Sequence, residues 1–146
     1  MDKGQIFQPR VANAKILIVD DDLDTIGLMR AVLQRSGYRV TTAASWEESI
    51  DRIKLAEQEG ERFDLIILDI MMPYRSGYDV YMTLQVILHP MPPVIFLSAK
   101  CTIDDMVRAS ELGAAKYLVK PTKREKLLET IHEVLVQGGR RVEKKT

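Results

Sequence analysis

Two stretches of sequence decide the fold: Ile16-Leu17-Ile18-Val19-Asp20-Asp21-Asp22 and Leu65-Ile66-Ile67-Leu68-Asp69. In each, four apolar residues are followed directly by a carboxylate. Apolar runs of this length are typical of strands that are covered on both faces, as in a parallel sheet. The carboxyl ends of such strands open into a common crevice. We therefore expect Asp20, Asp21 and Asp69 to lie together, where their mutual repulsion demands a cation.

The composition indicates a single globular domain without a charge bias. The chain has 146 residues, 46% of them apolar, and Lys+Arg and Asp+Glu balance at 21 each. Domains of ~100–150 residues are typical. Because positive and negative charges balance, no net electrostatic field attracts the protein to nucleic acid or to a membrane. No signal peptide is visible, and no apolar stretch approaches the ~20 residues of a membrane-spanning helix. Cys101 is the only cysteine, which suits a reducing compartment. We therefore expect a cytoplasmic protein that binds neither membranes nor nucleic acid directly.

Five apolar strand patterns alternate with five helical patterns along the chain. The strands are expected at 15–20, 38–43, 64–69, 94–97 and 116–119. Alternation with short connections indicates a doubly wound α/β fold, in which helices cover both faces of a parallel sheet. The organisation predicted along the chain is an irregular leader at 1–14, the folded domain at 15–137, and a solvated tail or the start of a linker at 138–146.

Capping residues mark where several helices begin. Asp22 is expected to cap the first helix, and Thr102 a short fourth helix. Capping boxes are expected at Ser45 and Thr122, each of which has Glu three residues later. The segment around Ser76 is interpreted as a loop before the third helix.

The acidic residues suit a hard divalent cation. Mg²⁺ prefers a few carboxylates plus waters and commonly acts on phosphoryl groups. Asp21 and Asp69 are the expected direct ligands, with Asp20 acting through bound water. The alternative is that the acidic run at 20–22 only caps the following helix. That reading fits Asp22 but does not account for Asp69, which stands behind four apolar residues.

Two further strand ends bear groups that suit phosphoryl chemistry. Ser98 follows the strand at 94–97, and Lys120 follows the strand at 116–119. A lysine supplies a point charge to a phosphoryl oxygen, and a hydroxyl donates a hydrogen bond to another. The sequence contains no Walker-type phosphate loop and no GxGxxG fingerprint. Acids, a hydroxyl and an ammonium group at one sheet edge therefore predict a phosphoryl-handling site.

These residues resemble the receiver domain of two-component response regulators. The resemblance covers about residues 15–137, and its blocks are Ile16-Leu17-Ile18-Val19-Asp20-Asp21, Asp69-Ile70-Met71-Met72-Pro73 with Gly77, Leu97-Ser98-Ala99, and Tyr117-Leu118-Val119-Lys120-Pro121. It implies a CheY-like, flavodoxin-like fold with strand order 2-1-3-4-5. It also implies a cis peptide bond between Lys120 and Pro121.

The resemblance assigns the chemistry of the acidic residues. Asp69 matches the aspartate that accepts a phosphoryl group from a histidine kinase or a phosphotransfer protein in a phosphorelay. Asp20 and Asp21 match the acidic pair that holds Mg²⁺, which Asp69 and the backbone carbonyl of Met71 would also contact.

The resemblance also assigns the switch. Ser98 and Tyr117 match the switch pair, and Lys120 matches the lysine of the motif. As Ser98 moves toward the phosphoryl group, Tyr117 is expected to fill the vacated space and to reshape the surface around 102–113 and 116–120, on the fourth helix, fifth strand and fifth helix. This surface would control a downstream effector or an output domain, with a phosphorylation-dependent dimer as one form of output. The chain would then be a signalling switch rather than an enzyme, assisting its own phosphorylation and dephosphorylation.

Two pairs of positions bear on how this chain differs within the family. Ala115 and Lys116 stand where many receivers that dimerise through their fourth and fifth helices have an acidic pair, which weakens the case for that dimer. Met71 and Lys100 lie two residues after the phosphoacceptor and the switch hydroxyl, where receivers tune hydrolysis of the phosphoryl group. Because a bulky apolar Met71 obstructs an attacking water, we expect slow self-dephosphorylation.

Two other functions remain open at this stage. A Mg²⁺-dependent phosphohydrolase with an aspartyl-phosphate intermediate would use the same acids, but Met71 stands where it would need a second acid, two residues after Asp69. A pseudo-receiver that only binds partners is disfavoured because all the chemical positions are filled.

Overall fold

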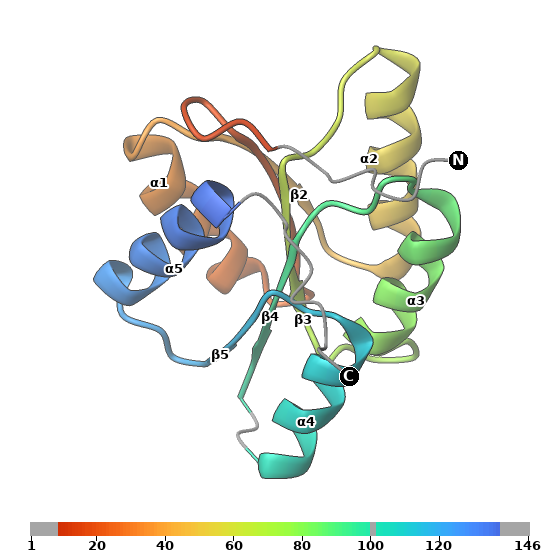
Figure 1. Cartoon of the computed structure of the whole chain (residues 1–146), viewed down its shortest axis with the longest axis vertical. Helices are drawn as coiled ribbons and strands as arrows, with labels where there is room; N and C mark the ends of the chain where they lie inside the picture. Colours follow the sequence, from red (N-terminus) through yellow and green to blue (C-terminus); the bar gives the residue numbers. More distant parts are fainter. Residues whose placement is uncertain (1–8, 100–101, 138–146) are drawn as a thin grey trace.

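A five-stranded parallel sheet forms the centre of the molecule (Figure 1). The computed structural model describes residues 9–99 and 102–137 of the chain. The strands are β1 (Lys15–Val19), β2 (Arg39–Ala43), β3 (Leu65–Asp69), β4 (Val94–Ser98) and β5 (Lys116–Val119). Their order is β2-β1-β3-β4-β5, as the resemblance implies, and every neighbouring pair is parallel. Each predicted strand is confirmed to within one residue at its ends.

Helices cover both faces of the sheet, which confirms the doubly wound fold. They are α1 (Leu23–Arg35), α2 (Trp46–Gln58), α3 (Gly77–Ile87), α4 (Ile103–Leu112) and α5 (Arg124–Gln137). Helices α1 and α5 lie on one face, and α2, α3 and α4 lie on the other (Figure 1). Within 9–99 and 102–137, none of the helices is long and apolar enough to cross a membrane.

The apolar runs in β1 and β3 explain why the sheet is covered on both sides. Alternate residues of one strand point to opposite faces. In β3, Ile66 and Leu68 enter the core beneath α2, α3 and α4, whereas Leu65 and Ile67 enter the core beneath α1 and α5. All five residues of β3 are buried, and so are all five of β4. A polar group at the end of such a strand is therefore placed at the rim of a closed core.

The helix caps partly match the predicted ones. Asp22 accepts a hydrogen bond from the backbone of Asp24 and Thr102 from that of Asp105, so both predicted caps are confirmed. Ser45 caps α2, but the Glu three residues later accepts from the backbone N–H of residue 44 rather than from that of Ser45. Helix α5 begins at residue 124, one residue later than a box starting at Thr122 requires, and the Thr122 hydroxyl donates to the backbone carbonyl of residue 119. A box that satisfies both donors occurs at Ser76, where the sequence suggested only a loop.

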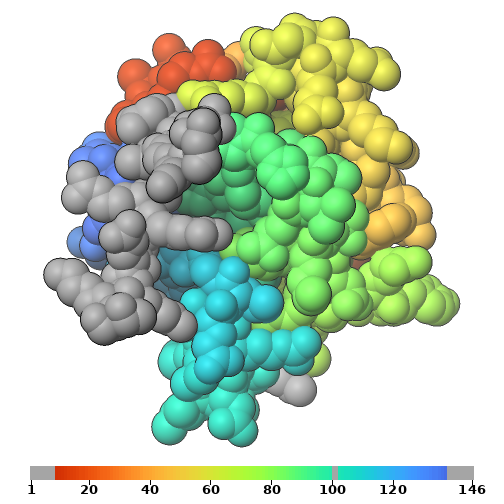
Figure 2. Space-filling view, turned by 45° about the vertical axis from the view of Figure 1, so that its right-hand side comes forward, coloured from red at the N-terminus to blue at the C-terminus, as the bar shows by residue number. Residues whose placement is uncertain are grey.

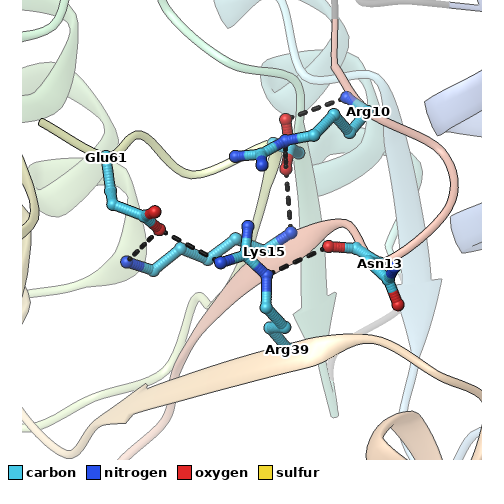
Figure 3. Close-up of polar contacts among 6 residues, drawn as sticks. Arg10, Asn13, Lys15, Arg39 and Glu61 are labelled. Atoms are coloured by element: carbon cyan, nitrogen blue, oxygen red, sulfur yellow. Dashed lines mark hydrogen bonds and ion pairs between the residues drawn. The ribbon is translucent and has the colours of Figure 1, made fainter.

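The buried carboxylate of Asp64 fastens the segment that precedes β1. Its Oδ1 accepts the backbone N–H of Arg10 at 2.9 Å, and its Oδ2 accepts that of Lys15 at 2.8 Å. Beside it, Glu61 binds the side chains of Lys15 and Arg39 at 3.3 and 3.2 Å (Figure 3). The described part of the predicted leader forms neither helix nor strand, and these contacts hold it against the amino edge of the sheet.

Candidate functional site

The carboxyl edge of the sheet gathers residues from four strand ends. Asp20 directly follows β1, Asp69 and Ser98 are the last residues of β3 and β4, and Lys120 directly follows β5. The register pairs Val19 with residue 68 and Asp69 with residue 97, which sets these ends side by side. The backbone N–H of Lys120 donates to the carbonyl of Ser98 at 2.8 Å, so the edge is continuous to its last strand.

The three predicted carboxylates lie together. One oxygen from each of Asp20, Asp21 and Asp69 falls within 4.8 Å of the others. Asp20 and Asp69 are only 1% and 3% exposed, whereas Asp21 lies at the surface. The backbone N–H of Asp22 donates to Asp20 at 2.9 Å and that of Met71 donates to Asp69 at 3.3 Å, which orients both buried side chains.

Lys120 reaches into this group and pairs unequally with the two buried acids. Its Nζ lies 2.7 Å from Asp20 Oδ2 and 3.4 Å from Asp69 Oδ1. Burial lowers the pKa of Lys120, but the hydrogen bond and charge of Asp20, with a further contribution from Asp69, outweigh that effect and raise the pKa above its ordinary value. The ammonium group therefore stays charged, and its stronger contact is with Asp20.

Asp69 is the acid whose charge is least compensated. Burial raises its pKa from 3.8 to about 6, and the nearby charge of Asp20 acts in the same direction. Lys120 and the backbone N–H of Met71 lower the pKa without cancelling the rise. A carboxylate that is costly to ionise and lies at the edge of the hydrophobic core is typical of functional sites.

The donor set fits a magnesium ion. Mg²⁺ binds oxygen at about 2.0–2.1 Å, so two of its ligands stand at most about 4.2 Å apart. The oxygens of Asp20, Asp21 and Asp69 already lie close to that limit. A divalent cation here would neutralise the acids that Lys120 leaves under-compensated, and the exposed Asp21 leaves an open side for water or a phosphoryl oxygen.

The remaining predicted residues lie at different distances along the strands: Ser98 ends β4, Met71 follows β3, and Tyr117 lies within β5. Ser98 is fully buried, and Tyr117 is half-buried beside the core beneath α2, α3 and α4. Met71 is half-exposed next to Asp69. Lys100, predicted to tune hydrolysis, lies outside the described residues, as does Cys101. The peptide bond between Lys120 and Pro121 is cis, which confirms what the resemblance implies.

Gly77 has a structural role that the sequence pattern did not reveal. Its backbone N–H donates to the carbonyl of Ile70 at 2.9 Å. A Cβ at this position would overlap the backbone carbonyl oxygen of Asp69 and would lie 2.8 Å from Ile70 Cα. Only a glycine allows the first turn of α3 to press directly against the end of β3. In the sequence Gly77 appeared only as part of the resemblance and of a loop signal, and neither indicates what this glycine contacts.

Comparisons with known proteins agree with this geometry. The family model described as the response regulator receiver domain matches residues 16–132. The alkaline phosphatase synthesis transcriptional regulatory protein PhoP of Bacillus subtilis is 41% identical over 109 residues, covering 75% of this chain and 43% of that protein. The transcriptional regulatory protein CpxR of Escherichia coli is 35% identical over 121 residues, covering 83% of this chain and 49% of that protein. The chain thus spans about half the length of the curated relatives it matches.

Solved structures with similar folds are receiver domains as well. A CheY-like response regulator receiver domain protein from Methanospirillum hungatei has a TM-score of 0.76 and 29% identity, over 87% of this chain and 97% of the other. The chemotaxis protein CheY4 of Vibrio cholerae has a TM-score of 0.72 and 33% identity, over 85% of this chain and all of the other. Domains of this family are phosphoacceptor signalling switches and generally bind Mg²⁺ at an acidic pocket. Fold, sequence and site agree, and the chain belongs to the response regulator receiver domain family.

Proposed function

We propose that Asp69 accepts a phosphoryl group from a histidine kinase or a phosphotransfer protein, and that this modification switches the surface formed by α4, β5 and α5. Asp20, Asp21 and Asp69, with the backbone carbonyl of Met71, would hold Mg²⁺. When bound, the ion offsets negative charge on the transferring oxygens. Asp69 Oδ attacks phosphorus in line while the bond from phosphorus to the imidazole nitrogen of the donor histidine breaks, and the imidazole leaves with that electron pair. Lys120 keeps its positive charge close to the transferring group.

The observation that supports this proposal best is the electrostatic state of Asp69. It is nearly fully buried and lies among two other carboxylates, and Lys120, the cation that pairs with it among the described residues, is bound more tightly to Asp20. A group whose charge is under-compensated responds strongly to a cation or to covalent modification. A carboxylate needed only for structure would be expected to have a full set of partners.

Phosphorylation would supply much of the free energy needed to move a two-state surface. The aspartyl-phosphate brings new negative oxygens, which Ser98 and Lys120 would contact at ~1–3 kcal/mol each as charge-assisted hydrogen bonds. Moving an equilibrium from 1:99 to 99:1 requires about 5.5 kcal/mol. Two contacts therefore supply a large part of a full switch. Tyr117, which is paired in register with residue 96 of β4, would then move toward the space that Ser98 leaves.

The domain boundaries and partners follow the same proposal. Residues 15–137 would form the receiver domain, with a leader before it and a tail or linker after it. Because the matched relatives include transcriptional regulatory proteins of which this chain covers only about half, an output domain or a separate effector would read the switch. A phosphorylation-dependent dimer is a further form of output, although Lys116, at the edge of that surface, pairs with Glu133 within the same chain. We place the protein in the cytoplasm, where histidine kinases present their phosphohistidine.

Intact mass after incubation with acetyl phosphate and Mg²⁺ tests the proposal. The wild-type chain should gain the mass of one phosphoryl group, and Asp69→Asn should gain none. Sustained hydrolysis of the donor without a stable adduct would instead favour a phosphohydrolase. A wild-type chain that never gains mass would favour a module that only binds partners.

The lifetime of the adduct tests the role of Met71. We expect slow self-dephosphorylation because the half-exposed Met71 side chain stands beside Asp69 and obstructs an attacking water. Met71→Ala should shorten the lifetime of the phosphorylated chain several-fold, as followed by intact mass after the donor is removed. A wild-type half-life of only seconds would contradict this expectation.

A further inference from the structure

Helix α4 is held to the molecule by little apolar packing. Only one of its residues, Ala109, is buried. Three of its larger apolar side chains face solvent, with Ile103 79%, Val107 48% and Met106 39% exposed, whereas Leu112 is half-buried against the core. In Figure 2 the cyan segment that contains α4 projects from the body of the molecule. Since burial contributes little here, other contacts must fix the position of this helix.

Side chains from α3 supply those contacts. The Tyr81 hydroxyl donates to the carbonyl of Leu112, the last residue of α4, at 2.9 Å, and Gln85 Nε2 approaches the same oxygen at 3.5 Å. A carbonyl in the last turn of a helix has no partner within the helix, so these donors act as its cap. Near the other end of α4, the Tyr78 hydroxyl donates to the carbonyl of Asp105 at 3.4 Å, and the guanidinium of Arg108 stacks over the Tyr78 ring at 4.1 Å.

The same tyrosines are connected to the phosphorylation site. The rings of Tyr78 and Tyr81 both pack against Phe96 in β4, with centroids at 5.4 Å, two residues before Ser98. Tyr78 directly follows Gly77, whose backbone presses on the end of β3. Helix α3 therefore contacts the phosphoacceptor strand through its first turn and α4 through the side chains at positions 78, 81 and 85.

We propose that Tyr81, assisted by Tyr78 and Gln85, is a positioning residue that fixes α4 in its unphosphorylated place, and that the movement of α4 upon phosphorylation breaks the contact between Tyr81 and Leu112. This inference rests on the proposed function. Because binding and conformation are thermodynamically linked, a contact present only in the unphosphorylated state opposes the activated state. Its removal must therefore strengthen binding of any ligand that selects the activated state.

Titration with beryllofluoride, a phosphoryl mimic, in the presence of Mg²⁺ tests this linkage. Tyr81→Phe keeps the ring against Phe96 and removes only the hydroxyl. One neutral hydrogen bond corresponds to about a two- to tenfold change in an equilibrium constant. We expect Tyr81→Phe to bind beryllofluoride tighter by that factor in calorimetry. Hydrogen exchange of the α4 amides should also be faster than in the wild type before the mimic is added.

Two further variants sharpen the experiment. Tyr74→Phe removes a hydroxyl from a fully exposed tyrosine and should match the wild type in both measurements. Gln85→Met removes the longer contact to Leu112 and should change binding in the same direction by a smaller factor. If the wild type binds beryllofluoride and Tyr81→Phe binds it no more tightly, this inference is overturned while the proposed function stands. A wild-type chain that does not bind beryllofluoride would overturn the proposed function, and this inference with it.

Discussion

Replacing Asp69 with Asn should stabilise the fold at neutral pH, because the buried carboxylate is costly to ionise. Its pKa rises from 3.8 to about 6 on folding, mainly because burial removes it from water. Each pKa unit corresponds to about 1.4 kcal/mol, so the ionised side chain lowers the free energy of unfolding by about 3 kcal/mol at pH 7. Asn has a similar shape without the charge, which makes about 3 kcal/mol the upper limit of the gain. The lost contact with Lys120 Nζ at 3.4 Å reduces it.

The sign of this effect can be checked by its pH dependence. Because the folded pKa lies above the unfolded one, the native state binds more protons between pH 3.8 and about 6, and wild-type stability falls as pH rises through that window. Asp69→Asn lacks this titration. The stability difference between the two chains should therefore be small near pH 4, grow up to about pH 6, and stay constant above it.

Urea denaturation of both chains from pH 4 to pH 8, without divalent cations, measures the difference. Asp51→Asn, on the exposed side of α2, is the control for loss of one acidic charge. Adding Mg²⁺ at pH 7 should raise the stability of the wild type more than that of Asp69→Asn, because the ion binds the native carboxylates. An Asp69→Asn chain no more stable than the wild type at pH 7 would refute the electrostatic reasoning, whatever its phosphorylation behaviour.

Three further substitutions test other parts of the structure. Gly77→Ala should lower the free energy of unfolding by at least about 2 kcal/mol in urea denaturation and should reduce labelling of Asp69, since its Cβ overlaps the backbone of β3. Tyr74→Gly should raise the free energy of unfolding by about 0.5–1 kcal/mol in the same measurement. Tyr74 is fully exposed and has a φ of 68°, a left-handed conformation that glycine adopts without strain. The relief of this strain should exceed the entropy cost of glycine. Asp64→Ala should cost about 3 kcal/mol of thermal or urea stability and speed hydrogen exchange of the Arg10 amide, because two backbone donors and a guanidinium lose a buried partner.

The strands and the acidic edge were predictable because the information is local. Four apolar residues followed by an acid, as in the run ending at Asp69, specify both a buried strand and a polar end. The capping box that begins α3 at Ser76 was not predicted, because the first aliphatic residue of the helix, Val80, comes one turn later. Ser76-Gly77 also has the composition of a loop.

Two long-range contacts outside the acidic edge of the sheet were not predictable from one sequence. Asp64 binds the backbone of Arg10, 54 residues away, and Tyr81 binds the carbonyl of Leu112, 31 residues away. In the sequence Asp64 is only an acid at a strand start, and Tyr81 only an aromatic residue at helical spacing. Which carbonyl or amide each one reaches depends on how the layers pack, and no local pattern records that.

On the proposed function, the unequal pairing of Lys120 would explain how one covalent change moves several elements. In the unphosphorylated chain its ammonium group lies 2.7 Å from Asp20 and 3.4 Å from Asp69, so most of its charge compensates the acid that is not modified. A phosphoryl group on Asp69 would carry up to two negative charges on oxygens that lie farther out. The ammonium group of Lys120 would then be attracted from Asp20 toward these oxygens. The backbone N–H of Lys120 donates to the carbonyl of Ser98. A shift of Lys120 would therefore act on the ends of β4 and β5 together.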